Sequence, residues 1–330
     1  MNALYERAAK LPAARQAGRK VRMTAVTTLI ASYGVTLTVV AILVPQFYTP
    51  GNFQVVVTAS AIIGVISVGQ TLVVIAGAFD LSVGGVAPLA AIVFAKLANN
   101  GMSVSEAILV TVLIGLAVGV GNGYVVSVLS VNPLITTLAT LSICGGAAYA
   151  LSGGLTVTLT HPSDGVLGEF AIAQLPYFVL IFITIAVVAG LVLRFTVPGR
   201  WIHATGGSEE AARIAGIPTR ATVIAVYAAC AALAALAGLF ATSELFAGTA
   251  TIQNDSSLTS VTAVVLGGAE LTGGTGSVTG TILAVLLLSS ISNTLAIGQV
   301  GTFYTQIITG AILLMVVLAS RLASRFGTRP

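Results

Sequence analysis

The sequence predicts an all-helical protein that crosses a membrane many times. Only 14 Lys or Arg and 10 Asp or Glu occur among its 330 residues, and the mean hydropathy is +1.04. A soluble domain carries about a quarter charged residues, so this chain needs lipid around most of its surface. The few charges are clustered, and they leave long uncharged stretches at 23–79, 107–163, 170–193, 221–243 and 271–320. A membrane β-barrel would instead show alternating polarity in segments of about ten residues.

Pro and Gly residues divide the uncharged stretches into individual spans of the length that a membrane helix needs. We expect about ten spans, at roughly 24–44, 53–77, 84–99, 106–128, 133–151, 176–195, 221–245, 257–268, 277–296 and 302–320. The third and the eighth are the shortest. Together the ten spans form a single transmembrane domain over residues 23–320.

Lys and Arg gather in three segments, which orient the chain. Six lie before the first span, four lie at 194–220 and three follow the last span. Cytoplasmic loops of membrane proteins are enriched in these residues. We therefore expect a cytoplasmic leader at 1–22, a cytoplasmic connector at about 196–220 and a cytoplasmic tail at 321–330. The leader differs from a cleavable signal peptide because the apolar stretch that follows it is too long. The net charge of +4 reflects this topology, so it indicates no nucleic-acid partner.

Residues that could do chemistry are scarce. The sequence has no Gly-Lys dipeptide and therefore no Walker-type phosphate loop. His161 and His203 fall on opposite sides of the membrane in this topology, so they cannot share a metal ion. Cys144 and Cys230 lie in different spans and are expected to be packing residues. We expect a chain that is no enzyme and that binds neither a metal nor a cofactor.

The cytoplasmic connector contains the pattern of a short capped helix. Ser208 can cap its start, and Glu209 and Glu210 suit the positive end of the helix dipole. Gly216 suits a left-handed exit, so we expect about two helical turns at 209–215. A helix this short is marginal in water and needs support from its own protein or from a partner. The residues alone leave two interpretations open, a coupling helix that docks on a cytoplasmic ATPase or a capped linker between two halves.

Two acid-and-glycine segments interrupt the apolar pattern, one in each half. Asp80 is the only charge between residues 23 and 95, and Gly77, Gly84 and Gly85 lie beside it. Glu270 repeats the pattern among five neighbouring glycines. Charged residues inside membranes usually face a cavity, a partner or an interface, and paired interruptions suggest broken helices near a transport path. The predicted topology places both segments near the cytoplasmic edge, where an ordinary turn with an exposed acid is one interpretation. A structural or gating role, direct cargo contact and a simple loop all stay open.

Several amides also lie inside predicted spans. Each needs a partner, which another helix, cavity water or a sugar hydroxyl would supply. The candidates for pathway or gating residues are Gln70, Asp80, Ser82, Asn122, Glu270 and Asn293. By contrast, Gly115, Gly119 and Gly123 recur every fourth residue and predict close helix packing.

Four motifs give the sequence a family resemblance. They lie at 69–85, 132–154, 199–217 and 271–281, and they occur in the order and at the spacing found in permeases of the ribose, galactose, xylose and arabinose importer family. The resemblance covers about residues 50–320. The chain departs from the family pattern just before Asp80 and at the position of Glu270.

The resemblance implies a permease subunit that forms a dimer with a second copy or a paralogue in the bacterial inner membrane. In this family ATP and Mg²⁺ bind to separate cytoplasmic ATPase subunits, and a periplasmic binding protein delivers a small sugar of the pentose or hexose class. Transport would follow alternating access. The residues that match or cap the family's ATPase-coupling segment are Ser208, Glu209, Glu210, Ala211, Ala212 and Gly216.

Two other functions remain open at this point. One is a related ATP-driven permease for nucleosides or branched-chain amino acids. The other is a self-sufficient secondary transporter or channel, in which Asp80 and Glu270 would be the residues to nominate for proton coupling.

Overall fold

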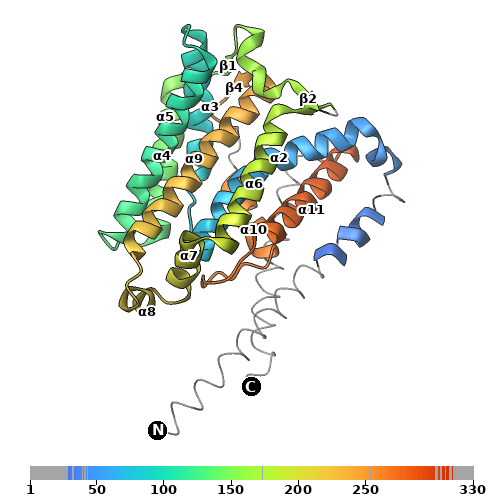
Figure 1. Ribbon diagram of the computed structural model, residues 1–330. Coiled ribbons are helices and arrows are strands. Elements are labelled where there is room, and N and C mark those ends of the chain that lie inside the picture. Colours follow the sequence, from blue (N-terminus) through green and yellow to red (C-terminus); the bar gives the residue numbers. More distant parts are fainter. Residues whose placement is uncertain are drawn as a thin grey trace, which may run out of the picture.

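The computed structural model describes residues 29–314 apart from positions 32, 39, 41, 43, 173, 253, 254, 302, 303, 305, 306, 309, 312 and 313. Within this part of the chain the structure is a bundle of helices with short strands at one end (Figure 1). Six of these helices are long and apolar enough to cross a membrane. They are α2 (Pro50–Ile75), α4 (Val104–Ser127), α5 (Pro133–Ser152), α6 (Tyr177–Phe195), α9 (Thr219–Leu245) and α11 (Val278–Ile297).

Two shorter apolar helices, α3 (Val83–Asn99) and α10 (Ser256–Leu266), complete the agreement with the eight spans predicted between 53 and 296. A helix at Leu29–Thr38 lies in the first predicted span. The tenth predicted span, 302–320, lies mostly outside the described residues, as do the leader and the tail. The prediction of an all-helical, multi-span protein is confirmed, whereas the count of ten stays a prediction.

Local sequence fixes where these helices begin and end. Ser103 and Glu106 form a reciprocal capping box at the start of α4. At α5, the side chain of Asn132 accepts from the first backbone N–H groups, and Pro133 fits the first helical position. Gly153, with φ +64°, closes α5 in the left-handed conformation that glycine tolerates.

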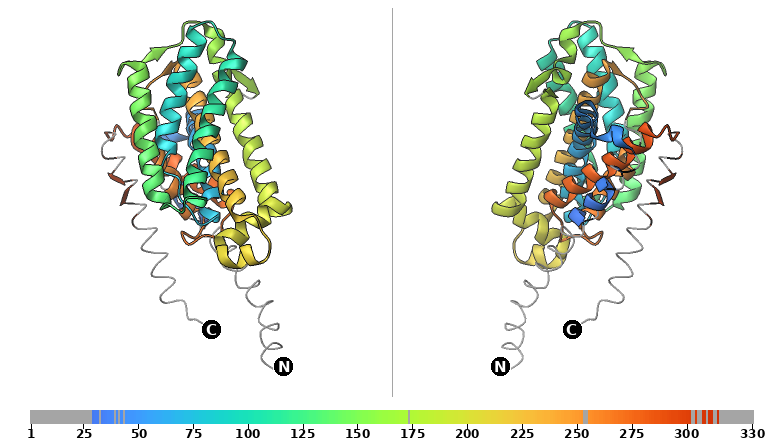
Figure 2. Two further views of the ribbon diagram at one scale, coloured as in Figure 1. Left: turned by 90° about the vertical axis from the view of Figure 1, so that its left-hand side faces the viewer. Right: turned by 90° about the vertical axis from the view of Figure 1, so that its right-hand side faces the viewer.

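The two ends of the bundle differ in structure. At one end β1 (Val157–Thr158) pairs with β4 (Ala247–Gly248), near η2 (Pro162–Gly168) and the hairpin of β2 (Phe170–Ile172) and β3 (Leu175–Pro176). At the other end lie α7 (Val197–Gly207) and α8 (Glu209–Ile214), which protrude below the bundle in both side views (Figure 2). The connector predicted to be cytoplasmic thus lies at the end opposite to the strands. A 3-10 turn, η1 (Pro45–Tyr48), precedes α2.

Helix α9 lies at the centre of the bundle, between α4, α3 and α2. The three glycines of α4 face it. A Cβ atom added to Gly115 would lie 2.7 Å from the carbonyl oxygen of Ala231, and one added to Gly119 would lie 2.3 Å from that of Tyr227. A Cβ atom added to Gly123 would lie 2.6 Å from the Cα atom of Ile224, which is also on α9. The predicted glycine face is therefore a packing surface.

Helix α10 spans only part of the bundle. Its 11 residues extend about 16 Å, roughly half of the ~30 Å apolar thickness of a membrane. Ser257, in its first turn, accepts from the N–H of Gly84 at 3.0 Å and donates to the carbonyl of Leu81 at 2.7 Å. The first turns of α3 and α10 thus meet inside the bundle. Of the interpretations left open for the Asp80 segment, the turn with an exposed acid is excluded, because the Asp80 side chain is buried.

Candidate functional site

Helix α8 has the form that the sequence predicts for the connector. The Ser208 hydroxyl accepts from the N–H of Ala211 at 3.3 Å, and the helix then runs from Glu209 to Ile214. At its end the N–H of Ile217 donates to the carbonyl of Ala212 at 3.0 Å around Gly216, whose φ is +81°. This six-to-one bond is the helix ending that a left-handed glycine makes possible.

Most of the surface of α8 is exposed. Ser208, Glu209, Glu210, Ala211 and Gly216 are all exposed, and Ala212 is the buried residue on which the helix sits. Ile214, near the end of the helix, is 80% exposed. The support that such a short helix needs comes partly from the chain itself, and its outer face is available for a partner.

Helix α7 was not predicted. It is capped by Thr196, whose hydroxyl accepts from the N–H of Gly199, and it returns against the end of α6. A Cβ atom at Gly199 would lie 2.2 Å from the carbonyl oxygen of Val192, so only glycine permits this reversal. The predicted helix at 209–215 is therefore the second half of a bent helical segment, α7 followed by α8.

Four of the predicted intramembrane candidates meet in one buried hydrogen-bond network. Asp80 accepts from both the N–H and the hydroxyl of Ser82, at 2.9 and 2.5 Å. Asn122 of α4 donates to the Ser82 hydroxyl at 3.0 Å and accepts from Thr140 of α5 at 2.6 Å. With its amide oriented to match, Gln70 of α2 pairs with the backbone N–H and carbonyl of Asp80 at 3.2 and 3.1 Å. All four candidates are buried.

Neighbouring helices hold the same segment from other sides. The Tyr227 hydroxyl of α9 donates to the carbonyl of Phe79 at 2.9 Å, and Ser257 of α10 bonds to Leu81 as described. Buried polar groups need such partners, since an unsatisfied one costs several kcal/mol in an apolar medium, of the order of 2–7. The network immobilises the break between α2 and α3.

Glu270 is separate from this network. Its side chain is exposed, and its backbone N–H donates to the carbonyl of Thr275 at 3.3 Å within the 267–277 loop. The structure thus places the two predicted acids in different surroundings.

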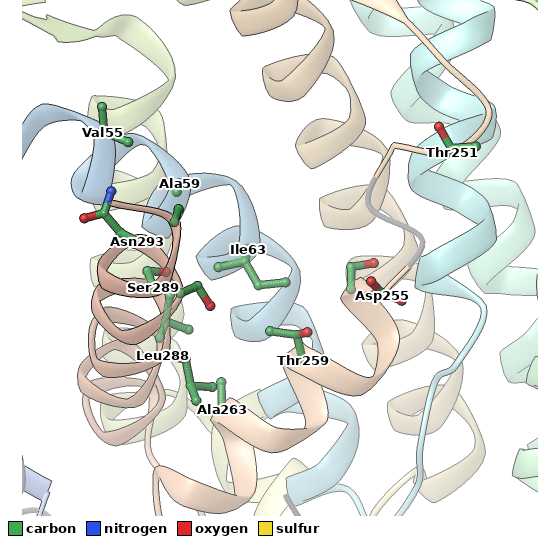
Figure 3. A pocket seen from close by; sticks show the side chains of 14 residues that line it. Val55, Ala59, Ile63, Thr251, Asp255, Thr259, Ala263, Leu288, Ser289 and Asn293 are labelled. Carbon is green, nitrogen blue, oxygen red and sulfur yellow. The ribbon is translucent and has the colours of Figure 1, made fainter. Parts of the chain in front are cut away.

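A cavity of about 500 Å³ lies between α2, α10 and α11 (Figure 3). This volume falls within the ~300–1,000 Å³ typical of small-molecule pockets. Helix α2 contributes an apolar wall that includes Val55, Ala59 and Ile63. The polar side chains come from the approach to α10, from α10 itself and from α11; they are Thr251, Asp255, Ser256, Thr259, Ser289, Ser292 and Asn293.

Asn293 is the predicted candidate that lines this cavity. Its Oδ1 atom is buried without a hydrogen-bond partner, and so is the hydroxyl of Ser256. Such groups are suited to bind a polar guest, because they gain a hydrogen bond that the protein does not supply. Ser256 borders the cavity while the next residue, Ser257, holds the α2–α3 break, so the first turn of α10 connects the cavity wall with the buried network.

Sequence reasoning missed the hydroxyl residues that α10 and α11 contribute to the cavity. A pattern does mark them. The otherwise apolar α10 begins Ser-Ser-Leu-Thr-Ser at 256–260, and α11 contains Ser-Ser-Ile-Ser-Asn at 289–293. Hydroxyl side chains clustered in one part of an apolar helix indicate a surface that does not face lipid.

Comparison with known proteins identifies the family. Residues 52–317 match the family model described as branched-chain amino acid transport system / permease component. No solved structure matches the chain.

Permeases of ABC transporters are among the relatives of the chain. It is 34% identical over 275 residues to the L-arabinose ABC transporter permease protein AraH of Azospirillum brasilense, covering 83% of this chain and 81% of the relative. It is 32% identical over 285 residues to the ribose import permease protein RbsC of Bacillus subtilis, covering 86% and 88%. A probable ABC transporter permease protein, y4mJ of Sinorhizobium fredii, is 35% identical over 279 residues, or 84% of each chain.

The family match covers most of the chain, and the structure supplies several helices able to cross a membrane. The chain therefore belongs to the family of ABC importer permeases of the ribose, galactose, xylose and arabinose type, as a multi-pass protein of the inner membrane.

Proposed function

We propose that this chain is the membrane-spanning subunit of an ATP-driven importer for a small sugar of the pentose or hexose class. The observation that carries the proposal is α8, a capped two-turn helix that protrudes from one end of the bundle with its outer face exposed. The arabinose and ribose permeases to which the chain is similar support a sugar as the cargo.

In this proposal α8 docks into a groove on a cytoplasmic ATPase. The exposed Ile214 offers apolar contact area, and Glu209, Glu210 and Arg213 offer charges around it. ATP and Mg²⁺ bind to the ATPase, whereas this chain binds neither and receives the resulting displacement. A second copy of this chain, or a paralogue, completes the transporter, and each copy presents its own α8.

The cavity between α2, α10 and α11 is the proposed station for the sugar. Its hydroxyl, amide and carboxylate groups match the hydroxyl groups of a sugar, and its apolar wall suits the carbon face of the ring. Few strong contacts are needed, since a periplasmic binding protein would select the cargo and deliver it at the end where β1 and β4 lie. Alternating access would open this cavity first to that end and then to the α7 end.

Energy dependence of uptake tests the proposal. Cells that express this chain with its native partners are given labelled arabinose, ribose, xylose and galactose, and a nucleoside and leucine in parallel. We expect uptake of one of the sugars that stops when ATP is depleted and continues when the proton gradient is collapsed. Uptake that follows the proton gradient would favour a self-sufficient transporter, and uptake of the nucleoside or of leucine alone would replace the sugar.

A pair of serine variants tests the cavity. Ser289→Leu fills the polar wall of the cavity, whereas Ser142→Leu adds the same side chain on an exposed position of α5. We expect Ser289→Leu to reduce uptake about tenfold, since blocking one good polar contact is worth roughly 1.4 kcal/mol, and Ser142→Leu to leave it unchanged. Equal uptake by the two variants would contradict the placement of the sugar path.

A further inference from the structure

The end of α7 is wedged between the two acid-and-glycine loops. A Cβ atom added to Gly206 would lie 1.8 Å from the carbonyl oxygen of Ile75, at the end of α2, and 2.6 Å from the nitrogen of Gly274, between α10 and α11. One added to Gly273 would lie 2.6 Å from the Cα atom of Gly77. We call Gly77, Gly206, Gly273 and Gly274 the glycine junction. It brings three segments, distant in sequence, into direct backbone contact.

Two hydrogen bonds fasten the junction. The N–H of Gly274 donates to the carbonyl of Ile75 at 2.8 Å, which links the 267–277 loop to the end of α2. The Nδ1 atom of His203, one turn earlier in α7, lies 2.9 Å from the carbonyl oxygen of Gly274. The imidazole therefore ties α7 to the same peptide that is tied to α2.

Contact through backbone atoms is stiff. Side chains between two helices absorb a shift by changing rotamer, but the junction has backbone on both sides at the places where a Cβ would overlap. Helix α7 continues directly into α8, and the N–H of Ser208 donates to the carbonyl of Ala204 at 3.1 Å. A displacement of α8 therefore reaches Gly206 within two residues and meets both loops there.

The junction also has space beside it. A cavity of about 450 Å³ borders Gly77, Gly206, Thr205 and Glu209, and it is lined by the α4–α5 connection on its other side. The hydroxyl of Thr205 is buried there without a hydrogen-bond partner. The end of α7 is thus packed tightly against the loops on one side and free to move on the other.

We propose that Gly206 is a positioning residue, which keeps the coupling segment in backbone contact with both loops, so that one displacement of α8 moves the ends of α2, α10 and α11 together. These three helices form the proposed sugar cavity. The inference rests on the proposed function, because it requires an ATPase that moves α8. Beyond that function, the inference names Gly206 as the point at which a movement of α8 is passed both to the loop after α2 and to the loop between α10 and α11.

The test uses the whole transporter, this chain with its ATPase and its binding protein, purified together and reconstituted in proteoliposomes. Gly206→Ala adds a methyl group inside the junction. Gly207→Ala adds the same group one residue later, where a Cβ meets nothing within 4 Å. For each variant one measures recovery of the ATPase, stimulation of ATP hydrolysis by the sugar-loaded binding protein, and sugar transported per ATP.

For Gly206→Ala we expect the ATPase to be recovered, its stimulation to be lost and uptake to fall about 100-fold, as for a misplacement of about 1 Å in a working site. For Gly207→Ala we expect all three within twofold of wild type. Stimulation and uptake within twofold of wild type in Gly206→Ala would overturn the junction while leaving the proposed function intact. A wild-type complex without ATP-driven uptake would overturn the proposed function and the junction with it.

A second pair of variants decides the matter if Gly206→Ala does not accumulate. His203→Ala removes the bond to Gly274, and His203→Asn keeps a nitrogen donor near the position of Nδ1. We expect about a tenfold loss of sugar transported per ATP in the first, corresponding to one lost hydrogen bond, and substantial recovery in the second. Equal coupling in His203→Ala and wild type would contradict the inference.

Discussion

The two acid-and-glycine loops of this permease, 76–82 and 267–277, are alike in composition and differ in how they are held. In the first loop the acid is buried, and side chains from α2, α4, α9 and α10 hydrogen-bond to the loop. In the second the acid is exposed, and backbone contacts hold the loop. Composition alone indicates a break in a helix, and the partners contributed by the rest of the fold determine how that break is stabilised.

The second loop is also closed by backbone contact where it returns into α11. A Cβ atom at Gly280 would lie 2.0 Å from the carbonyl oxygen of Gly267, so the two ends of the loop touch without side chains between them. In the first loop, side-chain hydrogen bonds do most of the holding beyond the glycine junction. Asp80 and Ser82 bond to each other, and Asn122, Tyr227 and Ser257 bond to the loop. Alanine should therefore be most damaging in the second loop, and loss of polar groups should be most damaging in the first.

The largest effect is expected for Gly280→Ala. Alanine favours a helix over glycine by roughly 0.5–1 kcal/mol, but overlap with a carbonyl of the backbone costs more. We expect the free energy of unfolding to fall by about 3 kcal/mol, measured by denaturant titration in mixed micelles. Gly298→Ala at the end of the same helix is the control, because its Cβ would meet its nearest atom at an ordinary 3.5 Å. If Gly280→Ala and Gly298→Ala are equally stable, backbone contact is not what holds the second loop, and the proposed difference between the loops is wrong.

The next largest effect is expected for Asp80→Ala. The change leaves the N–H of Ser82 without its acceptor in a buried site, which costs about 2 kcal/mol of unfolding free energy. Glu270→Ala removes an exposed carboxylate and should change stability by no more than about 0.5 kcal/mol. The same denaturant titration compares the two variants. If Glu270→Ala lowers the free energy of unfolding more than Asp80→Ala does, Glu270 and not Asp80 is the acid that stabilises the fold.

The smallest effect is expected for Tyr227→Phe. It removes one hydroxyl and leaves the carbonyl of Phe79 without that bond, at a cost of about 1 kcal/mol. Tyr149→Phe on α5, where the side chain is 47% exposed, is the matched control. If Tyr227→Phe lowers the thermal midpoint no more than Tyr149→Phe does, the α9 contact is not among those that hold the first loop.

Much of this fold could be predicted from the sequence. Eight of the predicted spans coincide with helices to within a few residues, because uncharged length and the Pro and Gly boundaries decide where a membrane helix can run. The short helix after Ser208 was also predicted, since its caps and its acidic first turn are local features. The glycine face of α4 followed from its four-residue spacing.

Other features depend on partners that are distant in sequence. The sequence left the surroundings of Asp80 open, because the residues that stabilise its segment, Asn122, Tyr227 and Ser257, come from three other helices. Helix α7 was missed because Pro198 and three glycines, Gly199, Gly206 and Gly207, weaken its helical propensity. Contact with α6 stabilises it.

The candidate site was predicted unevenly. Asn293 was identified and lies in the cavity wall, whereas Thr259, Ser289 and Ser292 were not, because single hydroxyls are common in membrane helices and bond to their own backbone. Only the packing of α2, α10 and α11 shows that these hydroxyls share one space.

The most direct test of the account is an affinity purification of the tagged chain from its native membrane, with the co-purifying proteins identified by mass spectrometry. Wild type is compared with the double variant Glu209→Lys and Glu210→Lys, which reverses two exposed charges on α8 where stability should change by less than about 0.5 kcal/mol. The account predicts a P-loop ATPase and a secreted binding protein with wild type, and loss of the ATPase with the double variant. The account would be contradicted if the wild-type chain purified without an ATPase and a binding protein, or if the double variant recovered the ATPase in full.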